Sequence, residues 1–153
     1  MIMDAIDRSI IKSLQQNGKL TNQELSDKVG LSPSPCLRRV RNLEKKGILT
    51  GYTALVDQDK YGLPLTVFVN IRLERHSDEC IKSFEQGVKR LDEVMECYLM
   101  TGKFDYLLHV VSEDLKTYEI FVRDKISTIP CIAGIDSSFV FGRVKRKMEF
   151  PAL

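Results

Sequence analysis

The chain has 153 residues, of which 43% are hydrophobic and 29% charged, and its net charge is +2. This composition is typical of a globular protein with one or two small domains, and no apolar run approaches the ~20 residues that a membrane helix requires. The first ten residues carry Asp4 and Asp7, whereas a secretory signal would be basic and then apolar, so we expect a cytoplasmic protein.

The cysteine pattern favours neither a metal site nor a disulfide framework. The four cysteines, Cys36, Cys80, Cys97 and Cys131, are scattered, and the chain has only two histidines. A zinc site needs about four nitrogen or sulfur ligands at short paired spacings, and disulfide frameworks are typical of small secreted domains. We therefore expect no metal, no cofactor and reduced thiols that pack as small hydrophobic residues.

The first 46 residues contain the start and stop signals of three short helices. Asp4 can cap a first helix, whose apolar residues recur every fourth position: Ile6, Ile10 and Leu14. Thr21 and Glu24 form a capping box for a second helix, which Gly30 ends. Ser32 and Pro33 open a third helix that runs to about Lys46. Two helices joined by a short turn with glycine predict a helix-turn-helix.

The third predicted helix has an apolar side and a basic side. The apolar side consists of Cys36, Val40 and Leu43, and the opposite side of Ser34, Arg38, Arg41, Asn42 and Lys45. Arginine and asparagine make bidentate hydrogen bonds to guanine and adenine edges, and lysines near a helix end suit phosphates. A charged outer face is also ordinary for an amphipathic helix. The turn, the caps and the clustered charge together favour DNA binding, and Pro35 would stiffen the end that enters the groove.

The residues after Gly47 mark the passage to a second domain. Residues 48–56 mix β-branched and aromatic side chains and predict a strand that leaves the DNA-binding unit, and the residues that follow are polar and turn-prone. We therefore expect a helix-turn-helix domain over 1–57, a linker over 58–64 and a second domain over 65–153.

The sequence pattern of the second domain predicts the order strand, helix, strand, strand, helix, strand. Strands are expected at 65–74, 94–100, 104–111 and from about 132 to 144, and helices after caps at Ser77 and Asp114. This order is the ferredoxin-like α+β arrangement, an antiparallel sheet with both helices on one face. The open face would carry Phe68, Leu107 and Val111, which is unfavourable in a monomer, so we expect a homodimer that buries it.

Two stretches of the sequence resemble the Lrp/AsnC, or feast/famine, family of transcription regulators. Residues 20–49 with Gly51–Leu55 resemble its helix-turn-helix, and Gly102–Leu108 matches the glycine and acidic positions of its effector-domain turn. The resemblance implies a (winged) helix-turn-helix and a ferredoxin-like effector domain that dimerises through its sheet. It also implies assembly to octamers, around which DNA bends or wraps, and an amino acid effector bound at contacts between dimers.

The resemblance also assigns residues to the two sites. It places DNA contacts at Ser34, Arg38, Arg39, Arg41 and Asn42, with Arg39 included although it lies on the flank of the helix. It places effector contacts at Leu99, Thr101, Gly102, Asp105 and Phe139. A free amino acid presents a carboxylate, which backbone N–H groups at a turn glycine can hold, and an ammonium group, which Asp105 can hold. The residues alone also allow a plain β-hairpin with a solvated Asp105.

We therefore predict a sequence-specific DNA-binding transcription regulator that responds to an amino acid. An architectural protein that bends DNA without an effector is the alternative, and amino acid titration separates the two. We expect no enzyme, because His76 and its neighbours Ser77 and Asp78 lack the scaffold of a catalytic triad. His109 and Cys97 could meet across adjacent strands, where a packed core pair is favoured over a thiol–imidazole catalytic pair.

Overall fold

The computed structural model describes residues 3–151, which divide into two compact units. The first unit contains the described residues up to Leu55 and again from Val144, and the second contains Val56–Arg143. Within residues 3–151, no helix combines the length and apolar character that a membrane crossing requires.

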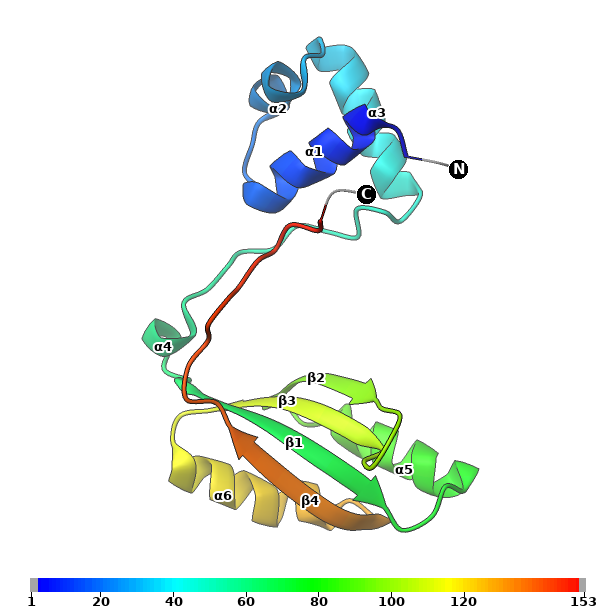
Figure 1. The fold of residues 1–153 in the computed structure, drawn as a ribbon, viewed down its shortest axis with the longest axis vertical. Coiled ribbons are helices and arrows are strands. Elements are labelled where there is room, and N and C mark those ends of the chain that lie inside the picture. Colours follow the sequence, from blue (N-terminus) through cyan, green and yellow to red (C-terminus); the bar gives the residue numbers. More distant parts are fainter. Residues whose placement is uncertain (1–2, 152–153) are drawn as a thin grey trace. The chain divides into compact units, whose positions relative to one another are not determined.

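Three helices form the first unit: α1 (Ala5–Gln16), α2 (Asn22–Val29) and α3 (Pro33–Lys45) (Figure 1). The predicted caps of the first two helices are confirmed. The Asp4 carboxylate accepts a hydrogen bond from the backbone N–H of Asp7 at 2.8 Å, and both halves of the Thr21–Glu24 capping box are present. The fully buried core residues come from all three helices: Ile10, Leu25, Cys36 and Leu43.

The chain between α3 and the second unit differs from the prediction. No strand forms over 48–56, so the strand that was expected to leave the DNA-binding unit is wrong for the described chain. The backbone N–H groups of Ile48 and Leu49 instead donate to the carbonyl of Leu43, and within residues 3–151 no second strand pairs with this segment. The predicted linker also contains a one-turn helix, α4 (Gln58–Tyr61), which Asp57 caps.

The second unit is a four-stranded antiparallel sheet in the order β2-β3-β1-β4, with two helices on one face (Figure 1). This topology confirms the predicted ferredoxin-like arrangement. The strands are β1 (Leu65–Leu73), β2 (Val94–Leu99), β3 (Tyr106–Ser112) and β4 (Ile132–Phe139), and the helices are α5 (Asp78–Val88), α6 (Leu115–Asp124) and a 3-10 turn, η1 (Ile126–Thr128). The last strand ends five residues before the predicted limit at 144.

The core of the second unit lies between the sheet and its helices. Alternate residues of β1 and β3 face α5 and α6 and are buried: Val67, Val69, Ile71, Leu73, Tyr106, Leu108 and Val110. The intervening residues face away from the helices. Because the period of a strand is two residues, the register places Phe68 opposite His109 on this open face, where their rings stack at 5.3 Å.

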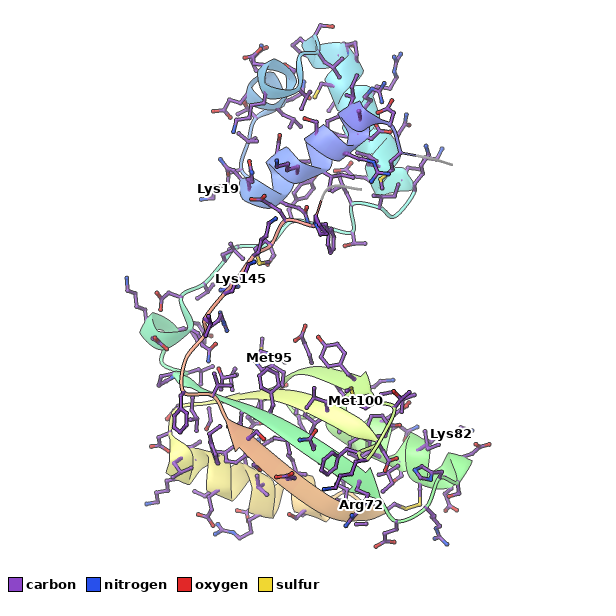
Figure 2. The ribbon with its side chains drawn as sticks, viewed as in Figure 1. Lys19, Arg72, Lys82, Met95, Met100 and Lys145 are labelled. Carbon is purple, nitrogen blue, oxygen red and sulfur yellow. A yellow bond between two sulfur atoms is a disulfide. The ribbon has the colours of Figure 1, made fainter. Side chains whose placement is uncertain are left out.

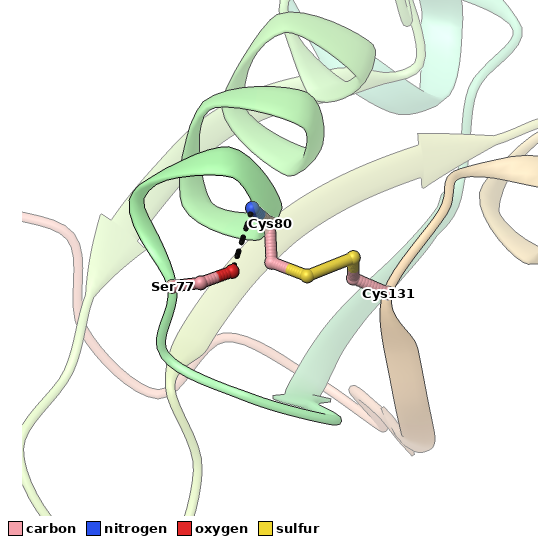
Figure 3. The surroundings of a disulfide bond; sticks show 3 residues. All are labelled: Ser77, Cys80 and Cys131. Atoms are coloured by element: carbon pink, nitrogen blue, oxygen red, sulfur yellow. Dashed lines mark hydrogen bonds between the residues drawn. A yellow bond between two sulfur atoms is a disulfide. The ribbon is translucent and has the colours of Figure 1, made fainter.

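A disulfide joins Cys80, in the first turn of α5, to Cys131, just before β4 (Figure 3). The expectation that all four cysteines are reduced is therefore wrong for this pair. The two residues are 51 positions apart in the chain, and only the packing of α5 beside the start of β4 brings them together. Cys36 and Cys97 are free thiols.

The end of the chain packs on the first unit rather than on the second. The side chain of Gln15 donates to the carbonyl of Met148 at 2.9 Å and accepts from the backbone N–H of Phe150 at 3.3 Å. The sequence assigned 65–153 to one domain, whereas the structure groups the residues from Val144 onward with the helices. Amide groups of an extended tail need partners, and Gln15 offers both a donor and an acceptor.

Candidate DNA-binding surface and effector site

The outer face of α3 presents the polar side chains that the sequence predicted. Ser34, Arg38, Arg41, Asn42 and Lys45 are all exposed, whereas Cys36 and Leu43 on the opposite side are buried against α1 and α2. Among the described residues, Arg38, Arg41 and Lys45 take part in no ion pair, so their charges are available to a polyanion. Pro35 is half-buried in the first turn of the helix, where no helical hydrogen bond is lost.

A left-handed glycine and two hydrogen bonds hold α2 and α3 at their turn. Gly30 ends α2 in the left-handed conformation, with φ of 69°, which a residue with a side chain rarely adopts. The backbone N–H of Leu31 then donates to the carbonyl of Ser26, and the Asn22 amide donates to the carbonyl of Pro33 at 2.9 Å. The start of the predicted recognition helix is therefore fixed to the helix before it.

Arg39 differs from the other arginines of α3, because its guanidinium is engaged inside the unit. The same nitrogen lies 2.7 Å from the carboxylate of Asp4 and 2.8 Å from that of Asp7, and the Arg39 side chain is 31% exposed. The backbone N–H of Asp7, and then Arg39, lower the pKa of Asp4. Arg39 lies on the flank of α3, as the sequence predicted, and a residue at that position reaches the neighbouring helix. Its position therefore accounts for the ion pairs. The structure thus ties Arg39 to α1.

The predicted effector residues Leu99, Thr101, Gly102 and Asp105 lie together in the connection between β2 and β3. This connection is closed by a hydrogen bond from the N–H of Met100 to the carbonyl of Asp105, at 2.8 Å. Gly102 adopts φ of 116°, a conformation that requires glycine. Among the described hydrogen bonds, the backbone N–H groups of residues 101–104 donate to no carbonyl, so they are available to an anion.

Asp105 is fixed against β1. Its N–H donates to the carbonyl of Ile71, and one carboxylate oxygen, Oδ2, accepts from the N–H of Leu73 at 2.7 Å. The other oxygen, Oδ1, lies 2.6 Å from Nε2 of His76. The Leu73 N–H, followed by His76, lowers the pKa of Asp105, so the carboxylate stays charged. Arg72, near the end of β1, and Met100, at the end of β2, mark this end of the sheet in Figure 2.

Phe139 lies away from this turn. It pairs with Val67 on β1, four residues from Ile71, which corresponds to about 13 Å along a strand. Its ring makes an edge contact with Tyr118 of α6 at 5.4 Å, on the helix side of the sheet. The structure therefore brings together four of the five predicted effector residues within one chain and leaves Phe139 at the other end of the sheet.

Cys97 and His109 do not meet, so the expected packed pair is wrong and the catalytic pair does not form either. Cys97 pairs in register with Leu108, so it faces the helix side of the sheet, whereas His109 faces the open side. Nδ1 of His109 lies 3.3 Å from the Glu96 carboxylate instead. The sequence also missed the contact between His76 and Asp105, because it spans 29 residues and no local pattern indicates it.

Two family models match the chain and divide it near the linker. Residues 3–50 match a winged helix-turn-helix DNA-binding model, and residues 66–150 match the Lrp/AsnC ligand-binding domain. The first match covers α1 to α3, and the second covers the sheet with α5 and α6.

Relatives and solved structures match over nearly the whole chain. The chain is 40% identical to the leucine-responsive regulatory protein of Escherichia coli K12 over 94% of this chain and 88% of that protein. It is 37% identical to the transcriptional regulator AzlB of Bacillus subtilis over 99% and 96%. A transcriptional regulator from Neisseria meningitidis, solved in complex with L-methionine, superposes with a TM-score of 0.94 at 37% identity, over 98% and 97%. These matches bear out the resemblance, and the chain belongs to the Lrp/AsnC family of DNA-binding transcriptional regulators with a ligand-binding domain.

Proposed function

We propose that the protein is a sequence-specific transcription regulator whose assembly and DNA binding respond to a free amino acid held at the turn between β2 and β3. The observation that carries the proposal is the pairing of free backbone N–H groups at residues 101–104 with the charged carboxylate of Asp105. These are the two complementary groups that the carboxylate and the ammonium of an amino acid require.

On the DNA side, the exposed face of α3 supplies the contacts. Arg38, Arg41, Asn42 and Ser34 read base edges in the major groove, and Lys45, near the end of the helix, binds phosphate. Pro35 shapes the leading end of the helix. Arg39 supports this face from behind through its ion pairs with α1, and so acts as a positioning residue.

The protein acts as a homodimer through the open face of its sheet, and dimers assemble further, to octamers. Phe68 and Tyr98 are 37% and 47% exposed on or beside this face. Nε2 of His109 is buried there, and within residues 3–151 it has no hydrogen-bond partner. An apolar surface with an unpaired polar atom favours burial against a second copy of the chain. The second copy would supply apolar contacts to the two aromatic rings and a hydrogen-bond partner to Nε2 of His109. Effectors bound between dimers then shift the assembly that binds them better.

The experiment that tests the proposal combines footprinting on the DNA upstream of the protein's own gene with titration of each common amino acid. L-methionine and L-leucine come first, because one regulator named above was solved with L-methionine and another is called leucine-responsive. We expect one or more amino acids to shift both the footprint and the sedimentation of the protein. If no amino acid shifts the footprint or the sedimentation at millimolar concentration, the proposed response to an amino acid is wrong. The alternative, an architectural protein that bends DNA without an effector, is then favoured.

Arg38→Ala tests the DNA face in the same footprint. We expect a loss on the order of 1–3 kcal/mol at the preferred base and relaxed choice at that position. Arg90→Ala is the matched control, because Arg90 is exposed on the other unit. An equal loss on random DNA would reassign Arg38 to the phosphate backbone.

A further inference from the structure

The two carboxylate oxygens of Asp105 have partners of different kinds. Oδ2 accepts from the backbone N–H of Leu73, which belongs to β1 and is held in place by the sheet. Oδ1 is bonded by the His76 ring, whose side chain is 71% exposed on a loop. The first partner is a main-chain group of a strand, whereas the second is an exposed side chain, which can rotate into solvent and leave.

We propose that His76 competes with the ammonium group of the effector for Oδ1 of Asp105, and thereby sets the affinity of the effector site. This inference rests on the proposed function. An imidazole N–H and an ammonium N–H are both cationic or polar donors, and Oδ1 is the oxygen that is not bound by the sheet. An ammonium group that takes Oδ1 must displace the histidine.

The surroundings of Asp105 leave His76 as the exchangeable partner. Arg72 is the other cation that lowers the pKa of this carboxylate, but its guanidinium makes no hydrogen bond with Asp105 in the described chain. The Asp105 side chain is 19% exposed, and within the described residues His76 is the side chain that hydrogen-bonds its carboxylate. Withdrawal of this one ring therefore frees Oδ1.

The loop that carries His76 is held at both ends, so the ring stays close to Asp105 after it detaches. The N–H of Glu74 donates to the carbonyl of Cys131 at 2.9 Å, and the N–H of Cys80 donates to the hydroxyl of Ser77 at 3.3 Å (Figure 3). The disulfide then ties Cys80 to Cys131. A tethered competitor acts at a high effective concentration, which a free ligand has to overcome.

The expected size of the effect follows from the exposure of the pair. A hydrogen bond made by an exposed side chain contributes little net free energy, so the His76 ring occupies Oδ1 for most of the time but leaves at little cost. The apparent affinity of a site is reduced by the fraction of time that it is free. Removal of the histidine should therefore tighten effector binding by roughly three- to fivefold.

The test is calorimetric titration of the full-length protein with L-methionine and with L-leucine. We expect His76→Ala to bind the amino acid three- to fivefold more tightly than the wild type, as estimated above. Arg75→Ala is the matched control, since it removes a cation from the same loop, and it should bind as the wild type does. Unchanged or weaker binding by His76→Ala overturns the inference, because a supporting residue gives that result.

Asp105→Asn separates this inference from the proposed function. If Asp105→Asn binds L-methionine as well as the wild type does, the proposed effector site fails. If it loses binding while His76→Ala gains none, the competition alone fails. Slowly exchanging amides of β1 and β3 that keep their protection in both variants show that the second unit is folded.

The histidine signal gives a second readout. The chain has only two histidines, so His76→Ala assigns their ring signals in an NMR spectrum. Saturating L-methionine should move the His76 signal of the wild type to its position in Asp105→Asn. A His76 signal that stays in place as the site fills overturns the inference.

Discussion

The recognition helix and the effector turn reach their geometry by different routes. The helices of the first unit are fixed by contacts over three or four residues, such as the Thr21–Glu24 box. The effector turn is fixed by partners 29 and 32 residues away, His76 and Leu73. The comparison teaches that the DNA-binding unit depends on local sequence, while the sensing unit depends on the closure of a sheet.

The two units also differ in what stabilises them. The first has a small buried core of four residues among its helices, supported by the Arg39 ion pairs. The second has a core of thirteen buried residues and a disulfide that closes a long loop. Changes in one unit should therefore leave the other largely intact, and amide hydrogen exchange can follow each unit separately.

Loss of the disulfide should produce the largest difference between the units. Replacement of both cysteines, Cys80→Ala with Cys131→Ala, should destabilise the second unit by roughly 2–4 kcal/mol, because the bond closes a loop of about 50 residues. Slowly exchanging amides of β1 and β3 should lose protection, while those of α1 and α3 should not. Cys97→Ala is the control, and equal losses in both units would contradict the comparison.

Arg39→Ala should have a smaller effect, confined to the first unit. Asp7 is nearly buried, and it would lose the cation that pairs with it. We expect protection of amides in α1 and α3 to fall roughly tenfold, the scale for a buried polar group without a partner. The double variant Asp7→Asn with Arg39→Ala should regain part of the lost amide protection.

The same variant distinguishes positioning from recognition. DNA binding by Arg39→Ala should weaken evenly over different sequences, whereas Arg38→Ala should change the preferred base. A changed base preference in Arg39→Ala would return this residue to the DNA contacts.

The smallest expected effect is the acid response of Asp105. Its pKa is lowered by the Leu73 N–H and by His76, so the charged form stabilises the fold at neutral pH. That contribution is present above the ordinary carboxyl pKa and is lost as the pH falls through the lowered value, below about pH 4. Asp105→Asn should therefore be less stable than the wild type at pH 7, and urea unfolding should show this difference shrinking steadily as the pH falls below about 4.

Much of the fold could be predicted from the sequence because its determinants are local. Caps at Asp4, Thr21 and Asp114 mark helix starts, and alternation along 65–74 marks a strand. The prediction of a strand over 48–56 was wrong for a physical reason. A strand needs a hydrogen-bonded neighbour, and β-rich composition does not supply one.

The sequence by itself determined the two-unit organisation around a helix-turn-helix and a βαββαβ order, since cap spacing and hydrophobic period act over a few residues. Only the tertiary structure decided which side chains meet from distant parts of the chain: His76 with Asp105, Cys80 with Cys131, and Arg39 with Asp4 and Asp7. These pairs lie about 30 to 50 residues apart in the chain, and folding of the whole unit is what brings their atoms within bonding distance.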